Sequence, residues 1–513
     1  MKRFLITISL ILGCALLFVV GLGVILALAP GSRIFGIEYV SAQVGKANVT
    51  EEWAEYINGD IYLNTKDVPI TINFEPYGTT KVEFNQNFSG YTTGGLRVPE
   101  AEIVKDNNGI TVKTNEIQKF LIGRSANYGL TLTLPSSWGT SGRHSIYIYG
   151  NNSKITVNAD ENITLKFVQL KLNGKGNVAL NCKIETRDLE IYSPKSITVG
   201  QDLFAENITA QSHSGNINID YSLSGNLNVK TVSGNVNFIS CVNATIETSS
   251  GKVTCNADSS VIYNKANITT KSGSVTLSCL MGTLENNNIT TNSGSININT
   301  MFAGSLNSER GKISVNTLFE ANVIGGTNTI TIGSVGKSIN IESKRGKVMV
   351  GSLDGEVANN VTVTTTTGDI IASNTSGNVS LTTKSGKVTL YNTKSNNVSI
   401  NSGSTVLATG LMGSVNIASN GEMNLAVNSV NDDITITGGS KCGKINITFE
   451  NVKLSEINYN ITTTSKNGGI ARIYSGQKVE KEGVSLTPET ITENLKTLTI
   501  NATKCKINAY FMA

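Results

Sequence analysis

The side chains best suited to chemistry are few in this sequence and lie far apart. Its 513 residues include only two histidines, His144 and His213. A histidine-dependent catalytic triad or a histidine-built zinc site needs more than these, so we expect neither. The acidic pair Asp432-Asp433 could bind calcium with a further oxygen ligand, although a polar turn is the simpler interpretation. The residue types therefore predict no catalytic site, no metal site and no cofactor.

Other polar and aromatic positions are better suited to binding than to catalysis. Tyr147 and Tyr149 alternate with isoleucines and share one face of a strand, where they could stack on sugar rings or cover the end of the fold. Asp369 falls near Lys347 and Asn378 of neighbouring repeats, which suggests a solvated surface pair rather than a catalytic dyad. The densest basic spot, Lys344-Arg345-Lys347, could contact an anionic wall polymer or form an ordinary solvated corner. Both histidines are expected in surface turns.

The overall composition indicates a chain of many strands and tight corners. Charged residues make up only 16% of the chain, and 50 Gly stand against 7 Pro. The 42 basic and 38 acidic residues give a net charge of +4, which is small for this length. A protein that binds nucleic acid through bulk phosphate attraction would show a clustered basic excess. We therefore expect no nucleic-acid partner.

The amino-terminal segment predicts the compartment. Residues 4–29 carry no charge and exceed the ~20 residues that cross a bilayer, with Lys2 and Arg3 in front. We expect residues 1–31 to form a single-pass membrane anchor with the rest of the chain outside the membrane. Cleavage at Ala27-Leu28-Ala29, followed by secretion, is the alternative. The exported cysteines would then be either disulfide-bonded or small buried hydrophobes, and the second interpretation is favoured because their spacing matches no known framework.

A short phrase recurs through the centre of the sequence: Ser-Gly, a polar residue, an aliphatic residue, a polar residue and another aliphatic residue. We expect its glycines to be structural corners, because glycine adopts a positive φ without strain. Their average spacing suggests about 19 residues per turn, with shorter intervals as half turns. The predicted corners are Gly215, Gly225, Gly234, Gly251, Gly273, Gly294, Gly311, Gly346, Gly368, Gly377 and Gly386.

This repeat predicts an all-β fold, a parallel β-solenoid over residues 151–450. The two aliphatic residues of each copy share one face of a strand that is too short to bury that face alone. Stacking the copies in register would join these residues into one core and pair every strand with the turns above and below. Outward Asn, Ser and Thr columns could then hydrogen-bond along the stack. An antiparallel sandwich or a string of hairpins is the alternative.

The flanks are expected to cover the open ends of the solenoid. Residues 46–150 are predicted as a β-rich N-terminal region, with a short helix that starts at Asn48 and continues through Tyr56. A hairpin is expected from residues 69–74 and 80–84. Residues 451–513 are predicted as a C-terminal cap. It is expected to contain a short helix, with Thr487 as N-cap and Pro488 at the first helical position, that continues to about Lys496, and a last strand over 498–507.

The repeat behind an N-terminal anchor, with Leu132-Thr133-Leu134-Pro135 just upstream, resembles a large family of bacterial envelope proteins described as adhesins with β-strand repeats. The resemblance covers residues 125–450. It implies a surface-exposed β-solenoid linked to adhesion or envelope stress, and it brings no catalytic or binding residues.

Together these features predict a membrane-anchored, extracytoplasmic, non-catalytic surface protein. Its expected partners are the membrane, through the N-terminal helix, and a cell-wall glycan, a host glycan or another envelope protein. One alternative is a polysaccharide-acting β-helix enzyme, which would need carboxylates gathered on one solenoid face. The other is a component that senses envelope stress.

Overall fold

The computed structural model describes residues 2–28, 33–34, 37–42, 49–53, 58–66, 68–93, 101–106, 109–116, 122–151, 153–200, 202–255, 260–351, 358–464 and 468–512. The predicted cleavage site at Ala29 and the helix positions Asn48 and Tyr56 lie outside these residues. The chain forms two compact units, residues 1–228 and residues 229–513.

The first unit begins with α1 (Lys2–Leu28), a helix over the uncharged segment. Its side chains between Leu10 and Val20 are largely exposed. Within the described residues, no helix combines the length and the hydropathy of a membrane span.

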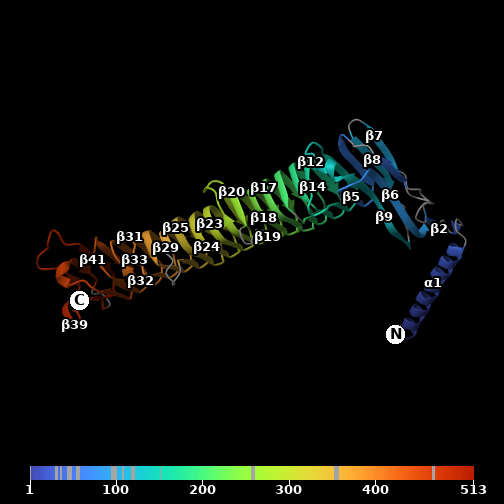
Figure 1. Cartoon of the computed structure of the whole chain (residues 1–513). Coiled ribbons are helices and arrows are strands. Elements are labelled where there is room, and N and C mark those ends of the chain that lie inside the picture. Colours follow the sequence, from blue (N-terminus) through green and yellow to red (C-terminus); the bar gives the residue numbers. More distant parts are fainter. Residues whose placement is uncertain are drawn as a thin grey trace. The chain divides into compact units, whose positions relative to one another are not determined.

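The remaining elements of the first unit are almost all strands (Figure 1). They are β1 (Arg33–Ile34), β2 (Ile37–Ala42), β3 (Val49–Trp53), β4 (Asp60–Lys66), β5 (Ile70–Glu75), β6 (Thr80–Thr92), β7 (Ala101–Asp106), β8 (Gly109–Glu116), β9 (Ile122–Pro135), the short helix α2 (Ser136–Gly139), β10 (Ile146–Asn151), β11 (Ile155–Ala159), β12 (Thr164–Gly174), β13 (Val178–Asn181), β14 (Lys183–Tyr192), β15 (Ile197–Val199), β16 (Leu203–Gln211) and β17 (Ile217–Thr231), which continues into the second unit.

The second unit is built in the same way. Its strands are β18 (Val236–Thr248), β19 (Val253–Cys255), β20 (Val261–Thr270), β21 (Val275–Leu280), β22 (Asn287–Thr291), β23 (Ile296–Ser308), β24 (Ile313–Gly325), β25 (Ile330–Ser343), β26 (Val348–Val350), β27 (Ala358–Thr365), β28 (Ile370–Ser373), β29 (Thr375–Thr383), β30 (Val388–Tyr391), β31 (Asn397–Ser402), β32 (Val406–Leu411), β33 (Ser414–Ser419), β34 (Met423–Val427), β35 (Ile434–Gly438), β36 (Lys444–Phe449), β37 (Asn458–Thr462), β38 (Ile470–Ser475), β39 (Lys478–Gly483), β40 (Ser485–Leu486), β41 (Thr497–Ala502) and β42 (Lys506–Phe511), with one 3-10 turn at Leu454–Glu456.

Strands of successive turns pair in parallel and in register, which confirms the predicted parallel β-solenoid. The aliphatic positions of the repeat therefore lie directly above one another and are at most 3% exposed. One such column in the first unit is Ile146, Leu170, Leu189 and Ile208, and one in the second unit is Ile296, Ile313, Ile330 and Val348. An antiparallel sandwich would give neighbouring strands opposite directions, so that alternative is wrong.

The outward asparagines hydrogen-bond between turns, as expected for stacked amides. The amide of Asn316 donates to Asn299, 17 residues earlier, and the amide of Asn446 donates to Asn424, 22 residues earlier. The first unit has the same arrangement, with Asn181 donating to Asn158 and Asn158 to Asn73. These side chains bond to one another along the stack, so their first role is structural.

The corner glycines serve close packing of the backbone more than chain reversal. Of the eleven corner glycines, Gly377 has a left-handed φ of 71°, and the other ten have no positive φ. Gly377 lies inside β29 and Gly225 lies inside β17, whereas the other nine lie outside strands. A positive φ was therefore the wrong reason for glycine at every corner except Gly377. A Cβ on Gly251, Gly273, Gly294 or Gly311 would fall less than 3.0 Å from the carbonyl oxygen of the glycine one turn earlier. Glycine is needed there because two backbones approach too closely for any side chain.

A buried Ser/Thr column completes most of these corners and was not predicted. The hydroxyl three residues before the glycine bonds to that glycine's backbone. Thr248 accepts from the Gly251 N–H at 2.9 Å, and Thr291 donates to the Gly294 carbonyl at 2.5 Å. The sequence does carry the signal, for example as Thr-Lys-Ser-Gly at 270–273 and again at 383–386. These hydroxyls satisfy backbone groups that the tight corner would otherwise leave unpaired.

Parallel stacking already begins at β4, so the predicted boundary at residue 151 falls after the first stacked turns. Strand β4 pairs with β10 on one side and with β8 on the other. Strand β5 likewise pairs with β11 and with β9. Both edges of β5 are thus occupied, and the predicted hairpin with residues 80–84 is wrong. Residues 49–53 form a strand along β6 rather than the predicted helix, because pairing with β6 overrides the local capping signal.

The last turn of the second unit is also out of chain order. Strands β41 and β42 lie between β35–β36 on one side and β37–β38 on the other. The predicted last strand is therefore an inserted turn, and antiparallel β39 and β40 border the outer strands. The predicted helix from Pro488 to about Lys496 is wrong. The buried Asn458 side chain bonds to the backbone of Thr492 and Leu495 and holds that segment in an irregular conformation.

Candidate functional site

The outer surface of the first unit carries a tyrosine face, formed by Tyr62 on β4 and by Tyr147 and Tyr149 on β10. Parallel register places Tyr147 directly beside Tyr62. The two rings stack with centroids 4.9 Å apart and planes 9° apart. The isoleucines and leucine that alternate with the tyrosines are fully buried, so the core fixes the outward direction of each ring.

On the other side of Tyr62, the residue in register is the small Thr111 of β8. Both residues line a cavity of about 830 Å³, together with Asn64, Lys113 and Tyr149. Because Tyr147 covers one face of the Tyr62 ring, the face toward Thr111 is the one that borders the cavity. The tyrosine face thus offers one open aromatic surface beside amide, ammonium and hydroxyl groups.

Asp60 anchors the wall of this cavity. One oxygen of its carboxylate accepts the Ser145 backbone N–H at 2.8 Å, and the other lies 3.5 Å from the Tyr62 hydroxyl. Burial, followed by the nearby Asp60 charge, raises the pKa of Tyr62, so this phenol stays protonated as a donor. Asp106 lines the cavity as well, and Lys113 at its rim pairs with Glu102 at 3.4 Å.

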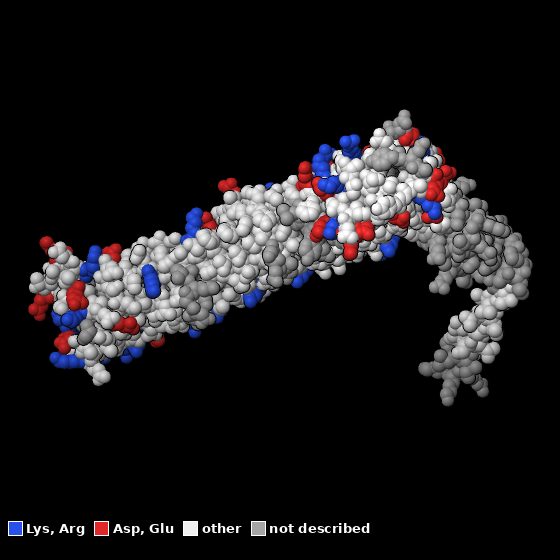
Figure 2. All heavy atoms as spheres, viewed as in Figure 1, with Lys and Arg blue, Asp and Glu red and all other residues white. Residues whose placement is uncertain are grey.

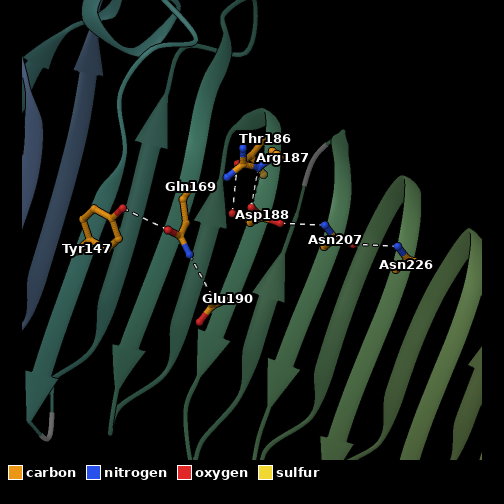
Figure 3. A network of polar contacts seen from close by, with 8 residues as sticks. All are labelled: Tyr147, Gln169, Thr186, Arg187, Asp188, Glu190, Asn207 and Asn226. Atoms are coloured by element: carbon orange, nitrogen blue, oxygen red, sulfur yellow. Dashed lines mark hydrogen bonds and ion pairs between the residues drawn. The ribbon is translucent and has the colours of Figure 1, made fainter.

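Figure 3 shows how the tyrosine face continues into a polar network on the following turns. The Tyr147 hydroxyl donates to Gln169 at 3.2 Å, and the Gln169 amide donates to Glu190 at 3.0 Å. Lys171 lies beside Tyr147 in register and pairs with Glu190 at 2.7 Å. These bonds tie three successive turns together and fix the position of the Tyr147 ring.

A second branch of the network runs parallel to the first. Arg187 pairs with Asp188 at 2.8 Å, Asn207 donates to Asp188 at 2.9 Å, and Asn226 donates to Asn207 at 2.8 Å (Figure 3). The Arg187 pair and the Asn207 bond lower the pKa of Asp188. This carboxylate is therefore held in its charged form as a structural acceptor, a poor state for a proton donor in catalysis.

His144 is not in a surface turn, which corrects the prediction. It is 5% exposed and stacks on Trp138 with ring centroids 4.7 Å apart. Burial lowers the pKa of His144, so the ring is neutral at pH 7. Trp138 in α2 also packs beside Phe74 and Phe167. His144 thus belongs to an aromatic cluster at the base of the cavity, while His213 is exposed in a bend as expected.

The acidic residues singled out in the sequence have structural partners. Asp369 accepts the Lys387 backbone N–H at 2.8 Å rather than forming the expected pair with Lys347. Asp433 accepts the Thr497 N–H at 2.8 Å, and Asp432 lies 3.7 Å from Lys496. Among the described residues, no group of three or more His, Cys, Asp or Glu side chains could hold a metal ion.

The basic spot at Lys344-Arg345-Lys347 is part of a longer basic edge on the second unit. We use this name for the exposed Lys252, Lys271, Arg310, Lys312, Lys344, Arg345, Lys347, Lys384 and Lys387, all at the glycine corners. The carbonyls of Lys312, Lys347 and Lys387 accept equivalent bonds from strands one turn earlier, so these residues share one column. Figure 2 shows basic atoms along the lower edge below the strands that Figure 1 labels β24 and β32.

Five of the six cysteines beyond α1 are buried, and Cys279 is partly buried. Burial raises the pKa of Cys182 to about 12, which makes its thiol unreactive. The prediction that cysteines act as small core residues therefore describes Cys182 well.

Neither the comparison with curated proteins nor the comparison with solved structures found a match. A family model described as Toastrack DUF4097, an uncharacterised family, matches residues 59–317 and 317–503. The first match begins one residue before β4, where parallel stacking starts, and the second ends within the inserted turn. The two matches cover most of the chain, and the protein therefore belongs to the Toastrack DUF4097 family, with a β-solenoid fold.

Proposed function

We propose that this protein is a non-catalytic interaction protein of the cell envelope that binds glycan through the tyrosine face of its first unit. The observation that carries the proposal is the open face of the Tyr62 ring beside a polar cavity of about 830 Å³. Sugar rings present flat apolar C–H faces edged by hydroxyls, so they fit an aromatic surface flanked by hydrogen-bonding groups.

The groups around the Tyr62 ring suit this ligand. Asn64 offers an amide donor and acceptor, and Lys113 offers an ammonium donor at the rim. Tyr149, 44% exposed, supplies a second aromatic edge one turn away. The Tyr147 stack and its bond to Gln169 hold the platform in place before a ligand arrives, which reduces the entropy lost on binding.

A glycan-binding screen of the purified protein tests this proposal. Tyr62→Ala should weaken binding of any captured glycan by at least about tenfold, the loss expected for a buried aromatic anchor. Tyr77→Ala is the matched control, because Tyr77 lies in the same unit, is 93% exposed and does not line the cavity. Equal affinities for the two variants would contradict the role of the tyrosine face.

The basic edge favours an acidic polymer as a second ligand class for the same function. Its lysines on alternate turns are about 10 Å apart, given ~4.8 Å between stacked strands. Lys312, Lys347 and Lys387 are all exposed, so their charges face solvent. An acidic wall glycan should therefore bind the triple variant Lys312→Gln/Lys347→Gln/Lys387→Gln more weakly than the wild-type full chain. Its affinity for the variant should also fall less steeply as the salt concentration rises. Lys230→Gln is the control, since Lys230 is paired with Glu247 at 2.9 Å.

Membrane attachment through α1 is a further part of the proposal. Residues 4–29 contain no charge, and exposed apolar side chains such as Leu16, Leu17 and Phe18 cover the helix. An apolar helix whose side chains face solvent gains free energy by leaving water. The full chain should sediment with membranes, and replacing these three residues by Ser should release part of it. Sedimentation unchanged by the replacement would count against α1 as the anchor.

The cavity also supports a second candidate, an enzyme that cleaves glycan. Asp60 and Asp106 lie in register on either side of Gly109, and both line the cavity. Paired carboxylates on one face are the arrangement that glycoside hydrolysis requires. The bond from Ser145 commits Asp60 to a structural role, which favours binding. Release of reducing ends from a bound glycan, lost in Asp106→Asn, would establish the enzyme instead.

A further inference from the structure

Two cysteines from distant parts of the chain meet in the second unit. The sulfur atoms of Cys442 and Cys505 lie 3.2 Å apart, although 63 residues separate them in sequence. Cys442 is in the turn between β35 and β36, and Cys505 is in the turn between β41 and β42. Their side chains are buried, at 2% and 0% exposure.

We propose that Cys442 and Cys505 are a disulfide-forming pair that locks the inserted C-terminal turn in place. Disulfide formation needs an oxidant, which is a protein disulfide or a small-molecule disulfide. The proposal rests on export of the chain only because export would bring it to that oxidant. It does not depend on the glycan-binding function.

The backbone geometry around the pair suits a disulfide. Strands β35 and β41 pair in register up to Gly438 and Ala502, and β36 and β42 pair from Lys444 and Lys506 onward. The two cysteines lie in the turns that follow β35 and β41, and their sulfur atoms are already 3.2 Å apart. A disulfide shortens this separation to about 2.0 Å, so a bond between them needs little movement.

The reaction balances as two thiol–disulfide exchanges. The thiolate of one cysteine attacks one sulfur of the oxidant's disulfide and releases one thiolate of the oxidant. The sulfur of the other cysteine then attacks Sγ of the first in the mixed disulfide and releases the second. Two electrons pass from the cysteines to the oxidant, and the two thiol protons are taken up by its thiolates.

The two thiols also share a hydrogen bond, in which either sulfur can be the donor. This bond lowers the pKa of one thiol, Cys442, and raises the pKa of its partner, Cys505. A proton shared in this way leaves one thiol of the pair the better thiolate to begin the exchange.

The bond would tie together strands that chain order leaves loosely connected. Strands β41 and β42 are inserted between β36 and β38 after the chain has passed outward through β37 to β40. A cross-link from Cys442 to Cys505 closes the loop that contains those outer strands. Closing a loop of this length restricts the unfolded chain and stabilises the inserted turn.

The test is oxidation of the purified full chain in a glutathione redox buffer, followed by alkylation of free thiols under denaturing conditions and peptide mapping. The expected result is one disulfide between Cys442 and Cys505 and slower hydrogen exchange in β41 and β42 on oxidation. Cys182 should stay free, because its sulfur contacts the Val157 carbonyl at 3.8 Å and, within the described part of the chain, bonds to no other cysteine.

Matched variants keep the test decisive. Cys442→Ser and Cys505→Ser should each abolish the cross-link, whereas Cys182→Ser should leave it intact. Alkylation of both Cys442 and Cys505 after oxidation of the wild type would overturn the proposal, as would linkage of either one to a different cysteine. Retained binding of a glycan in Cys442→Ser would show that a failure here is independent of the proposed function.

Discussion

A close backbone approach at one corner of the second unit predicts a large effect from a single methyl group. Gly294 lies against the carbonyl of Gly273 one turn earlier, and a Cβ there would be less than 3.0 Å from that oxygen. Gly294→Ala must therefore push two turns of the solenoid apart at the corner. A side chain cannot move aside to relieve the contact, because the obstructing atoms are backbone.

Three backbone hydrogen bonds at this corner set the expected loss of folding free energy in Gly294→Ala. They run from the Asn292 and Ser293 amides to Lys271 and from the Val275 amide to Ser295, at 2.8–3.1 Å. Losing them costs about 0.5–1.5 kcal/mol each, or about 1.5–4.5 kcal/mol together. The lower unfolded-state entropy of alanine offsets about 0.4–1 kcal/mol. We expect Gly294→Ala to destabilise this region by about 1–4 kcal/mol.

Hydrogen exchange of the full chain measures this locally. Amides of residues 275–296 should exchange at least about fivefold faster in Gly294→Ala than in the wild type. Gly443→Ala is the matched control, because the nearest atom to its Cβ is a Glu422 carboxylate oxygen at 3.8 Å. It should be neutral or slightly stabilising. Equal exchange in the two variants would refute close approach as the reason for glycine.

Three further predictions follow from buried groups and from the inserted turn. Burial lowers the pKa of His144 below its ordinary value of 6.5. The neutral ring therefore stabilises the fold fully above pH 6.5. This stabilisation is lost as the pH falls below 6.5, because the unfolded chain then binds a proton that the folded chain excludes. Thermal unfolding should show a wild-type loss of stability between pH 7 and pH 5 that is smaller in His144→Phe; an identical pH dependence would contradict the burial argument. Thr291→Val should cost about 1–3 kcal/mol in chemical unfolding, because its hydroxyl bonds to Gly294 and Ser308, while outward Thr290→Val should stay within about 0.5 kcal/mol. A chain that ends at Lys496 lacks β41 and β42 and should lose exchange protection in β37 and β38 but keep it in β23 and β24; full protection of β37 and β38 would mean that the inserted turn does not support them.

The stacking of the fold could be predicted because its signal is local and repeated. Each copy places two aliphatic residues on one strand face, and such a face can be buried only by other copies. The reason for the glycines could not be read in the same way, because a positive φ and a close approach select the same residue. Gly294 and Gly273 become neighbours only once the register of the turns is known.

The two wrong helices show the limit of local signals. Residues 49–53 carry a capping pattern but pair with β6, and the segment before Lys496 carries an N-terminal helix pattern but is held by Asn458. Both outcomes depend on partners far away in the chain. The tyrosine face has the same origin, because Tyr62 and Tyr147 meet only through the pairing of β4 with β10.

Ring-current shifts give the most direct test of the claim that the Tyr62 ring is a platform for a sugar. Proton NMR of a captured glycan, titrated with the full chain, should show upfield shifts of the C–H protons on one sugar face. These shifts should persist in Tyr62→Phe, which keeps the ring, and vanish in Tyr62→Ala. Upfield shifts that survive in Tyr62→Ala would place the sugar elsewhere and contradict the account.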